Sequence, residues 1–271
     1  MLKFALIFTA GYLTVLLGVI GFQRCLVYFP HRDYLLTPRD TGLAFDEVFL
    51  TTEDGTQICA WLVPAAAAEA PTVLYLHGNG SNLGDLVQLA CGFHELGFTF
   101  AAVDFRGYGK SAGNPTEAGL YQDGKAAYRW LTSKGIPPSR IFIYGQSLGG
   151  AVAAWLAARE PSAGLILEGV FPSLHASARH HYFFLFIPEA AVRDRFPTAE
   201  NAAKAKCPVL VVHGEKDMIA PFDFGKRVFA AAREPKFFCP VPGAGHNDIT
   251  PLIPPVSRSL EEFRSCCLAR R

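Results

Sequence analysis

The chain has 271 residues, of which 50% are hydrophobic and 18% are charged, and its formal net charge is +1. This composition excludes a disordered chain, and the near-zero charge gives no reason to expect a nucleic-acid partner. The length suits one large globular domain or at most two. Seven cysteines, an odd and scattered set, do not form a disulfide framework.

The first segment is not globular in character, because the run from Phe4 to Phe22 carries no charged residue. As a helix it has about the length of the hydrocarbon core of a bilayer. Residues 1–23 are therefore predicted to be a transmembrane anchor that contacts membrane lipid. A cleaved signal peptide and a buried core helix are the alternatives. Basic residues flank the run on both sides, so the orientation in the membrane stays open.

Residues 24–43 contain the aromatic and basic residues of a juxtamembrane segment, and residues 44–271 alternate short apolar runs with helical ones. The predicted strands are FDEVFLTT, ICAWLVP, TVLYL, FTFAAV, RIFIY, GLIL, PVLVV and FFCPV. The helical segments between them include LGDLVQLACGFHEL, TEAGLYQDGKAAYRWLTSKG and SLGGAVAAWLAARE. This rhythm is typical of buried, parallel strands with covering helices. The predicted fold class is α/β, with a mostly parallel, doubly wound sheet.

One connection is longer than a simple crossover requires. The residues at about 171–205 separate GLILEG from CPVLVV, and we predict that they form a short lid insertion. Its aromatic cluster comprises Tyr182, Phe183, Phe184 and Phe186. These rings could line an acyl pocket, enter a membrane surface, or only seal the lid to the domain.

The stretch IYGQSLGG places Ser147 between two glycines, after a predicted strand and before a predicted helix. The G-x-S-x-G pattern is weak evidence by itself. In the strand-to-helix context it predicts a nucleophile elbow, in which the serine is held on a strained turn. The alternative is a small packing residue at that turn.

A serine nucleophile needs a base, and the base needs an acid that orients it. Asp217 follows the predicted strand CPVLVV, and His246 follows FFCPV on a glycine-containing loop. Both positions lie at carboxyl ends of strands, where ligands bind in such sheets. Ser147, Asp217 and His246 are therefore the predicted triad. Glu168, at the end of GLILE, is the alternative acid.

Other polar residues after strands have structural interpretations. Asp104 is expected to fix the loop that follows it, and His77 and His213 to stabilise His-Gly turns. The group His175, His180 and His181 lacks partners at metal-binding spacing. No metal or organic cofactor is expected.

An oxyanion hole needs backbone N–H donors. Leu148, directly after the serine, supplies one, and the HGNG loop after TVLYL supplies the second, from Asn79 or alternatively from Gly80. The stretch HGNGSNLG could also belong to a dinucleotide-binding turn. That alternative gives no role to Ser147, Asp217 and His246, which occur in this order along the chain.

The motifs LHGNG, DFRGYGKS, YGQSLGG, HGEKD and GAGHND, in this order, resemble those of α/β-hydrolase-fold serine hydrolases. The N-terminal apolar run followed by LVYFP and HGN resembles the membrane-anchored abhydrolase-domain branch, which includes bud-emergence-type proteins and protein depalmitoylases. The likeness covers about residues 25–265. It implies the same triad and the same oxyanion pair, Asn79 and Leu148. The N-terminal cysteine cluster of the depalmitoylases is missing here.

These observations predict a serine hydrolase that cleaves an ester or thioester of a small-molecule, lipid-like or acylated substrate. A serine peptidase of the same fold is one alternative. A catalytically silent hydrolase-fold scaffold at the membrane is another. The side of the membrane and the oligomeric state stay open.

Overall fold

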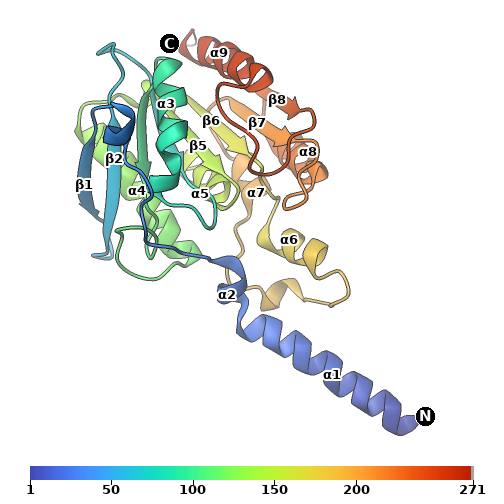
Figure 1. Ribbon diagram of the computed structural model, residues 1–271. Coiled ribbons are helices and arrows are strands. Elements are labelled where there is room, and N and C mark those ends of the chain that lie inside the picture. Colours follow the sequence, from blue (N-terminus) through green and yellow to red (C-terminus); the bar gives the residue numbers. More distant parts are fainter. Residues whose placement is uncertain (270–271) are drawn as a thin grey trace.

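The computed structural model describes residues 1–269, except for the side chains of Leu2 and Ala5. These two side chains belong to the predicted anchor. Residues 270 and 271, at the end of the predicted hydrolase domain, also lie outside the described part of the chain. The domain is built on one sheet with strand order β1-β2-β4-β3-β5-β6-β7-β8 (Figure 1). The strands are Asp46–Thr51 (β1), Gln57–Val63 (β2), Thr72–Leu76 (β3), Thr99–Val103 (β4), Ile141–Gln146 (β5), Gly164–Glu168 (β6), Val209–Gly214 (β7) and Lys236–Val241 (β8).

The sheet is antiparallel only at one edge. β1 pairs antiparallel with β2 and β2 antiparallel with β4, and the pairs from β4 onward are parallel. The central strands β3, β5 and β6 are buried almost throughout, as expected of strands covered on both faces. The predicted α/β class and the mostly parallel sheet are confirmed.

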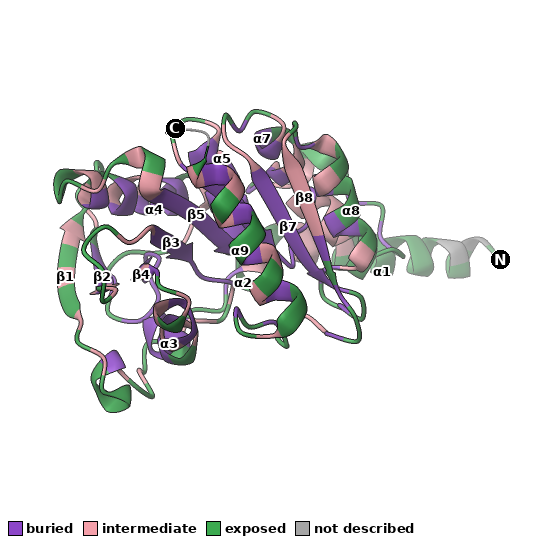
Figure 2. Cartoon of the chain, turned by 90° about the horizontal axis from the view of Figure 1, so that it is seen from above, coloured by how far each residue is buried: buried purple, intermediate pink, exposed green. Residues whose placement is uncertain are grey.

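Helices cover both faces of the sheet (Figures 1 and 2). Alternate residues of one strand enter different cores: Leu74 and Leu76 pack on the side of α4 and α5, and Val73 and Tyr75 on the side of α3 and α9. The helices of the domain are Val87–Glu95 (α3), Glu117–Ser133 (α4), Leu148–Ala157 (α5), Phe222–Ala231 (α8) and Pro254–Leu268 (α9), with 3-10 turns at Pro38–Thr41 (η1), Leu83–Leu86 (η2) and Pro138–Arg140 (η3).

The connection from β6 to β7 contains helix α6 (Leu174–His181), the 3-10 turn η4 (Glu189–Ala191) and helix α7 (Thr198–Ala202). Helix α6 lies beyond the carboxyl ends of the parallel strands, on the side where α2 (Gln23–Val27) enters the domain (Figure 1). The carboxyl ends of the parallel strands face this connection, so it borders the region where the predicted site residues lie.

Helix α1 (Leu2–Gly21) extends away from the domain (Figure 1). Within residues 1–269, no helix has both the length and the apolar character that crossing a membrane requires. The anchor stays a prediction. The hydroxyl of Tyr12 in α1 accepts a hydrogen bond of 2.8 Å from the backbone N–H of Phe186.

Candidate active site

Ser147 lies between β5 and α5 with φ 50° and ψ −115°. A left-handed backbone at a residue other than glycine costs on the order of 1–3 kcal/mol and persists only where its surroundings enforce it. The glycines on either side are required by close packing. A Cβ atom on Gly149 would lie 2.0 Å from the carbonyl oxygen of Leu76, and one on Gly145 would lie 2.3 Å from that of Gly149. This is the geometry that a nucleophile elbow needs.

Asp217 lies on the loop after β7 and is buried. Its Oδ1 accepts hydrogen bonds from the backbone N–H groups of Ile219, at 2.9 Å, and Ala220, at 2.8 Å. Its Oδ2 lies 2.7 Å from Nδ1 of His246. Burial alone would raise the pKa of Asp217, but hydrogen bonds from His213 and His246 outweigh it and hold this pKa well below its ordinary value. The carboxylate is therefore ionised at neutral pH.

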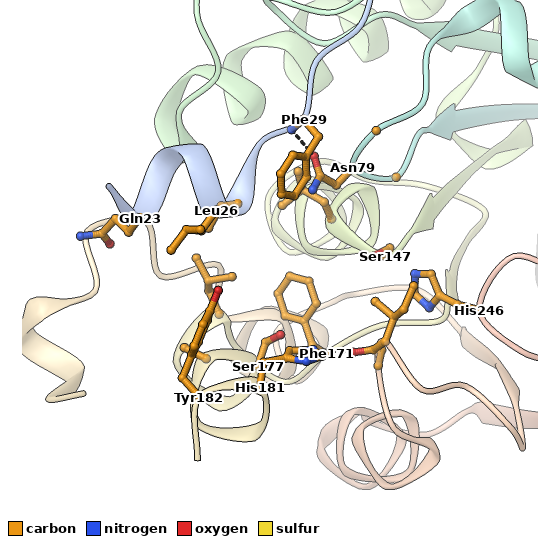
Figure 3. A pocket seen from close by; sticks show the side chains of 18 of the residues that line it. Gln23, Leu26, Phe29, Asn79, Ser147, Phe171, Ser177, His181, Tyr182 and His246 are labelled. Atoms are coloured by element: carbon orange, nitrogen blue, oxygen red, sulfur yellow. Dashed lines mark hydrogen bonds between the residues drawn. The ribbon is translucent and has the colours of Figure 1, made fainter. Parts of the chain in front are cut away.

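His246 lies on the loop after β8, with its ring between Asp217 and the open cavity (Figure 3). Because Nδ1 is directed at the carboxylate, Nε2 is the nitrogen available to a substrate. Gly169, directly after β6, makes room for the pair. A Cβ atom there would lie 3.2 Å from Cε1 of His246 and 3.5 Å from Oδ2 of Asp217, and its φ is +56°. Gly169 was not among the predicted site residues, although a glycine directly after GLILE was a usable signal.

Ser147 and His246 line the same cavity (Figure 3). In the described part of the chain the hydroxyl of Ser147 makes no hydrogen bond to His246 or to any other residue. Catalytic hydrogen bonds are often long without substrate and shorten when it binds. The structure thus brings Ser147 and His246 to the same cavity, and a hydrogen bond joins His246 to Asp217.

The two predicted oxyanion donors border the same cavity as Ser147. Leu148 is the first residue of α5, so its N–H has no acceptor within the helix. Asn79 lies on the loop after β3, directly before Gly80, whose φ is +74°. The side chain of Asn79 is directed at the segment around Phe29, and its Oδ1 accepts the N–H of Phe29 at 2.9 Å. Asn79 and Leu148 therefore both border the cavity that Ser147 lines.

Comparisons with known proteins show which proteins this chain is similar to. The family described as "Serine aminopeptidase, S33" matches residues 67–191. A Mycobacterium tuberculosis protein described as uncharacterized is 38% identical over 237 residues, which are 85% of this chain and 84% of that protein. Human alpha/beta hydrolase domain-containing protein 17B is 34% identical, over 75% of this chain and 70% of its own length. The chain belongs to the α/β-hydrolase family.

Two further similarities extend the comparison. The lysophosphatidylserine lipase ABHD12 of Danio rerio is 34% identical to this α/β-hydrolase, over 78% of this chain and 65% of the relative. Among solved structures, the Pyrococcus furiosus esterase Pf2001 has a TM-score of 0.69 at 22% identity and covers 89% of this chain and 98% of its own. At that identity the likeness shows the fold.

Glu168 of the α/β-hydrolase, the alternative acid, is buried at the end of β6. The hydroxyl of Tyr144 donates to Oε2 of its carboxyl group, and Nε2 of Gln146 donates to Oε1 at 3.0 Å. Within the described residues no hydrogen bond joins Glu168 to His246. Burial raises the pKa of Glu168 to about 7. Asp217, not Glu168, is thus the carboxylate that contacts the histidine.

The structural interpretations of two other residues agree with their contacts. Nε2 of His77 accepts the N–H of Phe105 at 3.0 Å, and its Nδ1 lies 2.8 Å from the carbonyl oxygen of Gly78. Burial lowers the pKa of His77, which keeps the ring neutral in these contacts. Oδ2 of Asp104 accepts the backbone N–H of Lys110 at 3.1 Å, in the loop that follows it, and Oδ1 accepts that of Leu83 at 2.8 Å, in the loop after β3.

The cavity in front of Ser147 has a volume of about 750 Å³. One wall comes from the end of α1 and from α2, and the opposite wall from α6 and the residues after it (Figure 3). The apolar and aromatic lining residues are Val19, Ile20, Leu26, Val27, Phe29, Leu148, Phe171, Leu174, Ala178, Tyr182, Ile187, Ala191, Val192, Ile219 and Ala220. Across residues 1–269, no group of three or more histidine, cysteine, aspartate and glutamate side chains could hold a metal ion.

The predicted aromatic cluster of the lid divides into two parts. Tyr182 lines the cavity. Phe183, Phe184 and Phe186 are 82%, 59% and 77% exposed. The three phenylalanines therefore neither line the cavity nor seal the lid to the domain.

Proposed function

We propose that this chain is a serine hydrolase that cleaves an ester or thioester of a lipid-like or acylated substrate through an acyl-enzyme. One observation carries the proposal. A single, largely apolar cavity is lined by Ser147, His246, Asn79 and Leu148, and the histidine is hydrogen-bonded to Asp217.

The proposed reaction has two steps. Nε2 of His246 takes the proton of the Ser147 hydroxyl, and the serine oxygen attacks the carbonyl carbon. The N–H groups of Asn79 and Leu148 hold the resulting oxyanion. The protonated histidine then gives its proton to the leaving alcohol or thiol, and the acyl group stays on Ser147. Water, deprotonated by the same nitrogen, releases the acid and regenerates the serine.

The lining of the cavity supports an acyl substrate. Clefts of about 300–1,000 Å³ with mostly apolar walls bind small apolar ligands. The far end of this cavity, away from Ser147 and His246, is bordered by Leu26, Tyr182 and the stem of Gln23 (Figure 3). An acyl chain that extends from the serine toward these residues would be removed from water.

A serine aminopeptidase is the second candidate, because the matching family carries that description. An aminopeptidase needs a carboxylate that receives the free amine of its substrate. Asp85 is the acidic residue that lines the cavity, and its Oδ2 lies 3.0 Å from Nε2 of His31. A peptidase activity would require that this contact between Asp85 and His31 open. The apolar walls favour the acyl substrate.

We also propose that α1 attaches the enzyme to a membrane. The described side chains between Leu6 and Leu17 are mostly exposed, although they are largely apolar. A helix of this kind is stable where lipid surrounds it. The full chain should stay in the membrane pellet after an alkaline carbonate wash, and Leu13→Arg/Leu17→Arg should release it, whereas Lys3→Ala should not. Recovery of the unaltered chain in the supernatant would refute this attachment.

Labelling by a fluorophosphonate probe tests the nucleophile. The purified full chain should be labelled, and Ser147→Ala should not, while its circular dichroism and melting temperature stay unchanged. Equal labelling of both proteins, or none of the folded wild type, would exclude the assignment. A p-nitrophenyl ester and acyl-thioester series of increasing chain length then tests the substrate class. Preference for acetyl groups or for aminoacyl amides would contradict it.

A further inference from the structure

A short segment connects α1 to the domain and crosses the mouth of the cavity. We call residues 22–34 the strap. Leu26, Val27 and Phe29 of the strap line the cavity, and the strap reaches the loop after β3 that carries Asn79. Figure 3 shows this contact as a dashed line between Phe29 and Asn79. The strap is thus part of the wall of the site, although it precedes the hydrolase domain in the sequence.

Two donors hold the side chain of Asn79 at one oxygen. Its Oδ1 accepts the backbone N–H of Phe29 at 2.9 Å and the hydroxyl of Tyr108 at 2.8 Å. Tyr108 is fully buried and packs edge-on against His77, with 5.1 Å between ring centroids. One donor therefore comes from the rigid domain and the other from the strap. A side chain held from two directions restricts the backbone of its own residue.

Other contacts hold the strap against the loops after β3 and β4. The carbonyl oxygen of His31 accepts the N–H of Gly109 at 2.9 Å. Nδ2 of the buried Asn82 donates to the carbonyl oxygen of Asp33 at 2.9 Å. These hydrogen bonds at His31 and Asp33, further along the strap, therefore help to fix the position of Phe29 relative to Asn79.

The other end of the strap is bound to the lid. The hydroxyl of Tyr28 donates to Oδ2 of the buried Asp194 at 3.0 Å. Oε1 of Gln23 accepts the N–H of Arg193 at 2.8 Å, and its Nε2 donates to the carbonyl oxygen of Ala191 at 3.2 Å. The strap thus joins the loop of Asn79 to the lid across the cavity.

We propose that the strap positions one of the two oxyanion donors. The N–H of Phe29 and the hydroxyl of Tyr108 hold the Asn79 side chain, and this fixes the direction of the Asn79 backbone N–H toward the substrate oxyanion. Asn79 has two parts in this arrangement: its amide would touch the reacting oxygen, and its side chain is a positioning group. The inference rests on the proposed serine hydrolase function.

Asparagine substitutions in the full chain test the positioning role. Asn79→Ala keeps the backbone N–H and removes the acceptor, whereas Asn79→Asp keeps an acceptor oxygen at the same place. A misdirected oxyanion donor should lower kcat for a short-chain ester by about 10- to 100-fold in Asn79→Ala, less than the loss of a whole donor. KM should change less than about threefold, and Asn79→Asp should retain most of kcat.

The affinity for a trifluoromethyl ketone separates positioning from a merely structural role. This probe forms a tetrahedral adduct with the serine, so its affinity should fall in Asn79→Ala by the same factor as kcat/KM. Phe29→Pro removes the N–H of the strap, and Phe29→Ala keeps it. Both substitutions remove the ring that lines the cavity, so the comparison between them isolates the N–H. The kcat of Phe29→Pro should be at least about tenfold below that of Phe29→Ala, and Asn79→Ala should cause little further loss in the proline background.

The outcomes separate the two proposals. If the folded wild type is not labelled by a fluorophosphonate, the serine hydrolase function fails. If it is labelled, but Asn79→Ala retains the kcat and the ketone affinity of the wild type, the positioning role fails. Equal losses in Asn79→Ala and Asn79→Asp would overturn the positioning role as well.

Discussion

Oδ2 of Asp217 lies 2.7 Å from Nδ1 of His246, which faces the cavity, and 3.4 Å from Nε2 of His213, which is fully buried. The same Nε2 of the buried histidine lies 2.7 Å from the carbonyl oxygen of Ala220, so its N–H is shared between that oxygen and the carboxylate. Hydrogen-bond donors thus surround the carboxylate, and its short hydrogen bond to a side chain is the one with His246 in the cavity.

Asp217→Asn should lower kcat by about 10³- to 10⁴-fold, since an amide no longer favours the histidine tautomer that a general base requires. Stopped-flow or steady-state hydrolysis of a p-nitrophenyl ester measures this loss. Glu168→Gln is the matched control, because it removes the other buried carboxylate near the site and should keep kcat within about fivefold. The reverse pattern would make Glu168 the acid.

The buried Glu168 predicts a pH dependence of stability. Its pKa is raised from 4.5 to about 7 by burial, so between these values the folded state binds more protons than the unfolded state. The stability that this group contributes is fully present below about pH 4.5 and is lost as the pH rises through about 7. The free energy of unfolding of the wild type should therefore fall relative to Glu168→Gln by up to about 3 kcal/mol.

Urea unfolding of both proteins at about pH 4.5, 6 and 8 measures that difference. Tyr144 and Gln146 both donate to Glu168. Glutamine keeps one acceptor oxygen, and the Tyr144 hydroxyl can rotate to accept from the new amide, so the variant should fold. A difference between the two proteins that does not change with pH would show that Glu168 ionises in the folded state as it does in the unfolded chain.

Gly149→Ala should destabilise the domain by about 2–4 kcal/mol, because the new Cβ atom would lie 2.0 Å from the carbonyl oxygen of Leu76 and 2.5 Å from that of His77. Backbone atoms of a central strand cannot move away from it easily. Chemical denaturation measures the change. Unaltered stability and unaltered labelling of Ser147 would contradict the close approach of α5 to β3.

Ser177→Trp should shorten the preferred acyl chain. Ser177 lies on α6 at the cavity wall and away from Ser147 and His246 (Figure 3). An indole there would fill space needed by the end of a long chain but not by an acetyl group. We expect kcat/KM for long-chain esters to fall at least about tenfold, because one methylene group gained or lost in an apolar pocket changes the binding free energy by about 1–3 kcal/mol. Leu35→Trp, at an exposed position outside the cavity, is the control.

Most of the fold could be predicted from local patterns. The apolar runs predicted as strands all form strands of the sheet, because continuous β-branched and aromatic runs can be buried on both faces only between helices. Helices α8 and α9 were not identified in advance. Helix α9 begins with Pro254 and Pro255 and has buried residues at Val256, Leu260, Phe263 and Cys267, a pattern that the sequence displays.

The carboxylate that pairs with His246 was harder to predict from the sequence. Glu168 ends β6 and Asp217 follows β7, so the sequence leaves both as possible acids for His246. The choice depends on which loop contacts the loop after β8, and that contact forms between β7 and β8, which are neighbours in the sheet. Gly169 shows the same dependence, because its missing side chain matters only where His246 packs against it.

The strand and helix rhythm, the elbow around Ser147 and the order of serine, aspartate and histidine could be predicted, since they follow from residues close together in the chain and from the periodicity of burial. That the strap before the domain lines the cavity, and that Phe29 contacts Asn79, became visible only in the folded domain. That contact joins residues 50 positions apart. It depends on where a packed domain directs two loops, and no local pattern of either segment specifies the other.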